Sequence, residues 1–157
     1  MAIVLNGLHP SKNPTFSEGK VLRAVDSLFT GGAVATNDFI VLASSLNMAD
    51  RIAGIQALNL PAYAGATVDI GFYQYVDGGL KSLGTALIAA KSLASALTGT
   101  DLLATSSNFG KNIGVILGST GDEAPIGGII LAAKLTAGTI AAFNGAVRVL
   151  VDKATTN

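Results

Sequence analysis

The chain contains no cysteine and no tryptophan, and its single histidine is His9. Without cysteine, a disulfide framework, a thiolate nucleophile and a cysteine-ligated zinc site are all excluded. His9 stands beside Pro10 in an irregular stretch, so a hydrolase triad or a histidine-bound metal would depend on a loop residue. We therefore expect no cofactor, no metal centre and no enzymatic activity.

Charged residues are also scarce. Asp, Glu, Lys and Arg make up 13% of the 157 residues, whereas about 25% is usual for a soluble domain. Ten basic residues balance ten acidic ones, so no net field would attract nucleic acid or an acidic membrane. Because so little charge is available to cover the surface, we expect much of that surface to lie against other copies in a homo-oligomer.

Long hydrophobic runs are missing as well. The longest stretch without a charge, residues 52–68, is interrupted by Gln56, Asn59 and Pro61, whereas a membrane span needs about 20 mainly apolar residues. The first residues, MAIVLNGLHPSK, lack the pattern of a secretion signal. We therefore expect no membrane partner and an intracellular place of synthesis.

What the sequence does contain is a series of short apolar or alternating stretches separated by turn residues, a pattern typical of strands. These stretches are residues 38–44, 51–60, 66–79, 113–117, 128–135 and 146–152. Asn144 and Gly145 tolerate positive φ and predict a turn before the last of them. Short strands at this spacing predict a mainly β fold, an antiparallel β-sandwich or a jelly-roll-like domain.

Two segments depart from this strand pattern. In residues 81–97, Leu and Ala gather on one side at about 100° per residue and Lys, Thr and Ser on the other, which predicts one helix against the β core. Residues 5–19 are rich in Pro, Gly and Asn and have little periodicity, which favours an extended arm. The predicted organisation is an N-terminal arm over residues 1–19 and a single β-rich domain over residues 20–157.

The stretch ATVDIGFYQYVDGG, residues 66–79, holds the best candidate surface residues. Alternation places Asp69, Tyr73 and Tyr75 on one face of a strand, where they would meet solvent or a neighbouring subunit. Asp77 would begin an Asp-Gly-Gly turn. A carbohydrate-binding platform built from Tyr73 and Tyr75 is the alternative interpretation, since sugars stack on exposed aromatic rings.

Three quoted segments carry a resemblance to a known class of protein. FIVLASSLNMADRIAGIQALNLP, ATVDIGFYQ and the closing GAVRVLVDKA together resemble small virion structural proteins of tailed bacteriophages, particularly capsid decoration or cement proteins. The similarity covers residues 38–76 and 113–153. It implies a β-sandwich or jelly-roll-like subunit, made in the host cytoplasm, that binds the outside of the capsid. Such subunits are often homotrimers that clamp adjacent copies of the major capsid protein, and the class has no catalytic residues.

The expected function is therefore a non-enzymatic capsid decoration subunit. A receptor- or glycan-binding module, a tail subunit and a major shell subunit remain alternatives. In the arm, Leu8 and Phe16 are the side chains that we expect to bury themselves on a neighbouring chain, where each would contribute roughly 1.5 to 3 kcal/mol. With Tyr73 and Tyr75, they are the predicted partner contacts.

Overall fold

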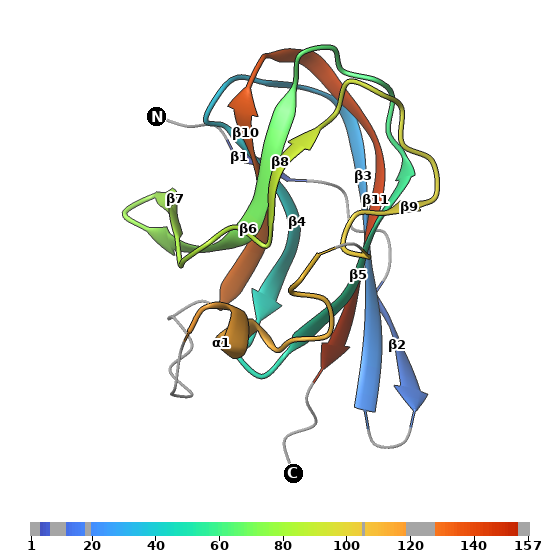
Figure 1. Cartoon of the computed structure of the whole chain (residues 1–157), viewed down its shortest axis with the longest axis vertical. Helices are drawn as coiled ribbons and strands as arrows, with labels where there is room; N and C mark the ends of the chain where they lie inside the picture. The colour runs from blue at the N-terminus through green and yellow to red at the C-terminus, as the bar shows by residue number, and fades with distance from the viewer. Residues whose placement is uncertain (1–3, 7–11, 18–19, 105, 119–127, 154–157) are drawn as a thin grey trace.

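A computed structural model describes residues 4–6, 12–17, 20–104, 106–118 and 128–153, and in it two sheets pack face to face as a sandwich (Figure 1). The first sheet has the order β1 (Val4–Asn6), β4 (Phe39–Leu46), β10 (Ile129–Ala137), β6 (Thr67–Val76) and β7 (Gly79–Ser82), and β8 (Ile88–Ser92) also pairs with β6. The second has the order β2 (Lys12–Ser17), β3 (Lys20–Val34), β11 (Ile140–Lys153), β5 (Arg51–Asn59) and β9 (Thr100–Asp101). The predicted mainly β, antiparallel sandwich is confirmed.

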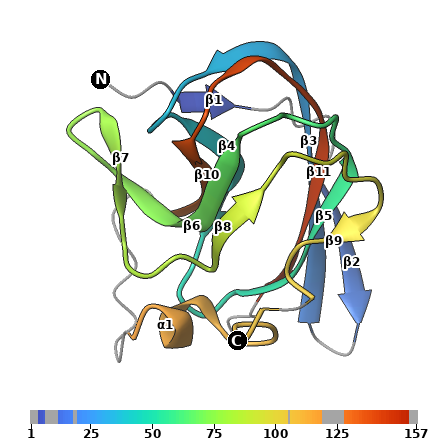
Figure 2. The ribbon, with the colours of Figure 1, turned by 45° about the horizontal axis from the view of Figure 1, so that its top comes forward.

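The two central strands are consecutive in the chain. β10 lies between β4 and β6, and β11 lies between β3 and β5. The chain passes from one sheet to the other between them, through Gly138 at φ +81°, where a Cβ would come within 2.6 Å of the Gly65 carbonyl oxygen. Two consecutive strands joined by one short connection therefore supply the middle strands of both sheets (Figure 2).

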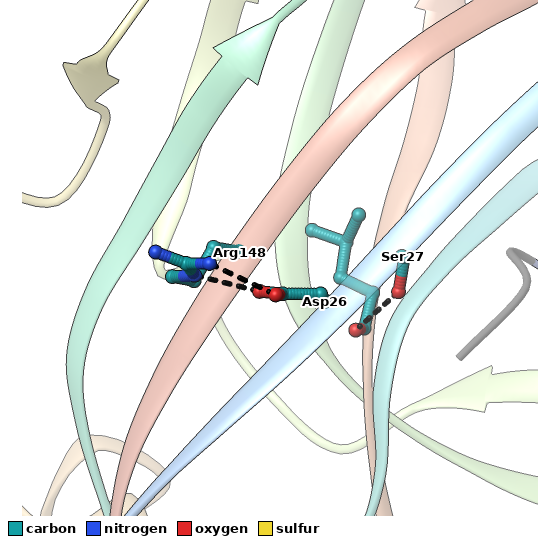
Figure 3. A network of polar contacts seen from close by, with 4 residues as sticks. Asp26, Ser27 and Arg148 are labelled. Carbon is teal, nitrogen blue, oxygen red and sulfur yellow. Dashed lines mark hydrogen bonds and ion pairs between the residues drawn. The ribbon is translucent and has the colours of Figure 1, made fainter. Parts of the chain in front are cut away.

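The core lies between the sheets and follows from alternation along the strands, except on β5, where a register shift between Gly54 and Ile52 brings Ile52 and Ile55 to the same face. Its fully buried side chains include Ile40, Phe72 and Leu131 from the first sheet and Ile52, Ile55 and Val149 from the second. The buried Ser27 hydroxyl on β3 donates a hydrogen bond to the Leu42 carbonyl on β4, 3.3 Å away, and so ties the sheets together (Figure 3). Apart from that polar link, these contacts bury the apolar faces that the alternation indicated.

Five of the strand predictions are confirmed, because residues 38–44, 51–60, 66–79, 128–135 and 146–152 fall largely within β4, β5, β6 with β7, β10 and β11. The sixth is wrong, since residues 113–116 form the one-turn helix α1 (Ile113–Ile116). Its first turn is held by the tertiary hydrogen bonds that Ile113 N–H and Gly114 N–H donate to the carbonyls of Asp50 and Met48. β3, the longest strand, was not anticipated from its sequence.

The predicted helix over residues 81–97 is also wrong. This segment contains the end of β7, all of β8 and an isolated bridge from Leu97 to Leu60. The leucines do face the core, as Leu87 and Leu93 are buried, but the backbone finds its partners on other strands. Leu93 N–H, for example, donates to the Ala66 carbonyl at 2.9 Å. Tertiary pairing thus overrides the helical periodicity.

The N-terminal segment was predicted to be an extended arm, and its described residues are strands paired with the sheets. β1 pairs in parallel with β4, and β2 pairs antiparallel with β3, so that the backbone of Phe16 lies opposite that of Val21. Edge strands pair through their backbone amides and need little apolar periodicity, which is why the composition did not reveal them. Leu8 and His9 lie outside the described residues. The division of the chain at residue 19 stays a prediction.

The Asn144-Gly145 turn is a further correction. Both residues lie inside β11, which runs without interruption from Ile140 to Lys153. The pairing of β11 with β3 shifts register just before Asn144, and Gly145 adopts φ +134°. The tolerance of glycine for unusual backbone conformations is therefore used for an irregularity within a strand.

Candidate functional site

The candidate site is a hollow on the outer face of the first sheet, the face turned away from the sandwich core. Alternation along β6 places Asp69, Gly71 and Tyr73 on this face, opposite the core-facing residues. The antiparallel register then puts Lys134 of β10 beside Asp69. On its other side, Lys134 stands beside Phe39 of β4. Three strands therefore contribute to one surface.

The hollow forms where the edge of β6 changes partners. β7 pairs with residues 73–76 of β6, whereas β8 pairs with residues 67–70, so the connecting chain leaves the edge near Gly71 (Figure 2). The backbone of Ala86 in that connection passes close to this point, with its Cα 3.5 Å from where a Cβ on Gly71 would lie. The resulting hollow has a volume of about 270 Å³.

Two aromatic rings form its apolar wall. Phe39 and Tyr73 meet edge to face with centroids 5.0 Å apart, and each is at least nine-tenths buried. They belong to a second, smaller apolar cluster that also contains Val41, Ile130 and Ala132. Because edge-to-face pairs are favoured by the ring quadrupoles, this arrangement holds the Tyr73 ring in a fixed orientation.

Polar groups line the rest of the hollow. The Asp69 carboxylate accepts a hydrogen bond of 2.7 Å from the backbone N–H of Ala90, and the Lys134 ammonium lies 5.9 Å from the centre of the Phe39 ring. Burial first, and then the negative charge of Asp69, raise the pKa of the Tyr73 hydroxyl. That hydroxyl therefore stays protonated at neutral pH and can both donate and accept a hydrogen bond.

Asp69 and Lys134 do not form an ion pair with each other. The three ion pairs found among the described residues join Arg51 to Asp152, Arg148 to Asp26 and Lys153 to Asp50. Asp69 and Lys134 take no part in them, although they are neighbours in the register. The hollow thus offers a carboxylate acceptor and an ammonium donor separately.

The two tyrosines predicted to share an exposed surface differ in burial. Tyr75 is 53% exposed, whereas Tyr73, which was expected to meet solvent or a neighbouring subunit, is buried by side chains of its own chain. The two rings therefore do not form an exposed platform for a sugar. Sequence reasoning named Asp69 and Tyr73 but missed Lys134 and Phe39, because only the register of β10 and β4 brings those two residues to this face.

A second feature is the β6–β7 hairpin, which projects from the body of the protein (Figures 1 and 2). Asp77 and Gly78 form its two-residue turn with φ of +51° and +80°, the pattern of a type I′ turn, and the predicted turn at Asp77 is confirmed. Beside it, Tyr75 and Val76 are 53% and 39% exposed. Consecutive strand residues point to opposite faces, so each side of the hairpin end carries an apolar side chain.

The outer face of the second sheet carries a structural ion pair. Arg148 donates two hydrogen bonds to the Asp26 carboxylate, at 2.7 and 2.9 Å, while Ser27 points to the other side of β3 (Figure 3). The hydrogen bond from Arg148 lowers the pKa of Asp26, and the same contact raises the pKa of Arg148. The bidentate pair joins β11 to β3, and each of its two charged groups has the other as its partner.

The described part of the chain carries neither a metal cluster nor a membrane-spanning helix. It holds no group of three or more His, Asp or Glu side chains arranged to bind a metal ion. None of its helical residues belongs to a segment with the length and hydropathy of a bilayer-spanning helix.

Comparison with known proteins finds no family model, no curated protein and no solved structure that matches this chain.

Proposed function

We propose that this protein is a non-catalytic structural subunit of a bacteriophage virion, of the capsid decoration or cement type. In this proposal it acts as a homo-oligomer, with a trimer favoured, and binds the major capsid protein at the capsid surface. The proposal rests on the sequence resemblance, on the low content of charge and on one structural observation. That observation is the projecting β6–β7 hairpin with apolar side chains on both of its sides.

The hairpin suits a role in assembly for a physical reason. A type I′ turn matches the twist of its strands and holds them in one register, so the hairpin end is preorganised. Tyr75 and Val76 each expose a large part of an apolar side chain. Covering both side chains on a partner would contribute about 1 to 2 kcal/mol for each hairpin that is bound. A rigid apolar projection of this kind fits between the surfaces of neighbouring subunits.

The test compares the wild-type protein with the double variant Tyr75→Ser, Val76→Thr. Light scattering at micromolar concentration should show a homo-oligomer for the wild type, and co-sedimentation should show binding to phage shells that lack this protein. The variant should weaken oligomerisation or shell binding by roughly 5- to 30-fold, because the lost burial is about 1 to 2 kcal/mol.

A matched control removes exposed apolar side chains elsewhere. Leu28 is 45% exposed on β3 and Val115 is 64% exposed on α1, so the variant Leu28→Ser, Val115→Thr should bind like the wild type. The proposal would be refuted if the wild-type protein were monomeric and did not co-sediment with shells. Binding to phage tails but not to shells would identify a tail subunit in its place.

A further inference from the structure

The hollow between Phe39, Asp69 and Lys134 has features that the assembly role does not require. We propose that it is a binding site for one neutral sugar unit, separate from the hairpin and independent of the proposed assembly. Its volume of about 270 Å³ lies just under the range of about 300 to 1,000 Å³ typical of drug-sized ligands. A ligand of monosaccharide size therefore fits the space.

The charges of the lining favour a ligand with no net charge. Asp69 and Lys134 contribute one negative and one positive group, and they are not joined in an ion pair with each other. For a free anion the attraction of Lys134 is offset by repulsion from Asp69, and for a free cation the attraction of Asp69 is offset by repulsion from Lys134, so a net charge on the ligand gains little. A hydroxyl group both donates and accepts, so neighbouring hydroxyls of a sugar could donate to the carboxylate and accept from the ammonium.

The apolar wall favours a sugar over other neutral polar molecules. Phe39 and Tyr73 line the hollow beside these polar groups with the small part of each ring that is not buried, and the ring of Tyr73 is held by its edge-to-face contact. A sugar is amphipathic in the same way, with C–H groups on the faces of its ring and hydroxyls around the edge. The protonated Tyr73 hydroxyl adds a third polar partner within the hollow.

Gly71 lines the hollow and, having no side chain, leaves its space free. A Cβ at this position would lie 3.7 and 3.8 Å from Cε2 and the hydroxyl oxygen of Tyr73 and 3.5 Å from the Cα of Ala86, which are ordinary contacts. Its φ is not positive, so alanine is compatible with the backbone. The variant Gly71→Ala therefore fills part of the hollow without disturbing either charge.

The test is a titration of the isotope-labelled full chain, followed by amide chemical shifts in NMR spectra. The probes are the methyl glycosides of glucose, galactose, mannose, fucose, N-acetylglucosamine and N-acetylgalactosamine, each raised to about 20 mM. At least one should shift the amides of residues 69–73, 80–86 and 134, with a dissociation constant on the order of 1 mM, as expected for so small a ligand.

Variants of the lining then locate the sugar. Asp69→Asn and Lys134→Gln should each weaken binding roughly tenfold, because each removes a charge-assisted hydrogen bond, and Gly71→Ala should weaken it at least threefold by steric exclusion, which is roughly the cost of a modest clash. The matched controls are Asp77→Asn, Lys81→Gln and Gly79→Ala, which change the same residue types on the hairpin and should bind within about twofold of wild type.

Three outcomes would overturn the proposal. One is that none of the six glycosides shifts the hollow amides at the highest concentration. Another is that binding is equally strong in the lining variants, whose folding the same spectra report. The third is that glycine or alanine, as free zwitterionic amino acids, binds the hollow while the sugars do not, which would assign the separated carboxylate and ammonium to a different class of ligand.

Discussion

Replacing Gly145 by alanine should strongly destabilise the protein. Gly145 lies in β11 at φ +134°, a conformation that side chains rarely adopt, and forcing a residue into it costs about 1 to 3 kcal/mol. The new Cβ would also overlap the Asn59 carbonyl oxygen and lie 2.6 Å from Cδ2 of Leu60, which adds about 1 to 3 kcal/mol of overpacking. The total is about 2 to 6 kcal/mol out of a usual 5 to 15 kcal/mol.

Thermal unfolding followed by circular dichroism measures this effect. At about 2 to 4 °C per kcal/mol for a chain of this length, Tm should fall by about 4 to 24 °C. Gly79→Ala is the matched control, because φ of Gly79 is not positive and its Cβ would have the Val76 carbonyl oxygen 4.0 Å away. Its effect should stay within about 0.5 kcal/mol. If Gly145→Ala melted within about 1 °C of the wild type, the close approach of β5 to β11 would be wrong.

Other perturbations test the ionic contacts and the metal expectation. Asp50→Ala should destabilise the protein by about 2 to 4 kcal/mol in denaturant titrations, because the carboxylate is 1% exposed and receives Lys153 Nζ at 2.9 Å; an unchanged midpoint would show that this pair contributes nothing. The lowered pKa of Asp26 means that its pair with Arg148 stabilises the fold fully above the unfolded value of 3.8. That contribution, about 0.5 to 1 kcal/mol for so exposed a pair, is lost as pH falls through the folded pKa. Asp26→Asn should flatten the acid limb of stability against pH, and an unaltered limb would contradict the assignment. Treatment with a chelator should leave Tm unchanged, and a fall in Tm would reveal a structural metal.

The strand pattern could be predicted from the sequence because alternation is a local signal. Val68, Ile70 and Phe72 point to the core and Asp69 points away from it, as their spacing indicated. The burial of Tyr73 was not predictable in the same way. A residue on the outer face is expected to meet solvent, and only the neighbouring strands bring a second apolar cluster to that face.

Residues 81–97 show why periodicity alone was insufficient. Leu87 and Leu93 do face the core, so the apolar positions were correctly identified, but an extended chain with bends can satisfy the same positions. What decides the conformation is the set of hydrogen bonds to distant backbone groups, such as that from Leu97 N–H to the Leu60 carbonyl. Hydrogen-bond partners so distant along the chain cannot be recognised from the periodicity of a short stretch of sequence.

The Asn-Gly pair illustrates a partial success. Its sequence correctly indicated an unusual backbone, since Gly145 has positive φ. The reason is a close approach of Asn59 and a hydrogen-bonded contact in which the Tyr63 hydroxyl donates to the Asn144 carbonyl and accepts from the Asn144 N–H, at 2.8 and 2.7 Å. Tertiary contacts of this kind, and likewise the meeting of Asp69 with Lys134, follow from register between strands that are remote in sequence.

The central positions of β10 and β11 have a consequence for synthesis on the ribosome. When β3, β4 and β5 have emerged, neither sheet has its middle strand, and the ribosome must still translate from Asn59 to Ile129 before β10 begins. At about 5 to 20 residues per second this takes on the order of 4 to 14 s. During that time the nascent chain holds apolar strands with unpaired edges and little charge to keep copies apart. The yield of folded protein should therefore respond to translation rate and to chaperones that shield such segments.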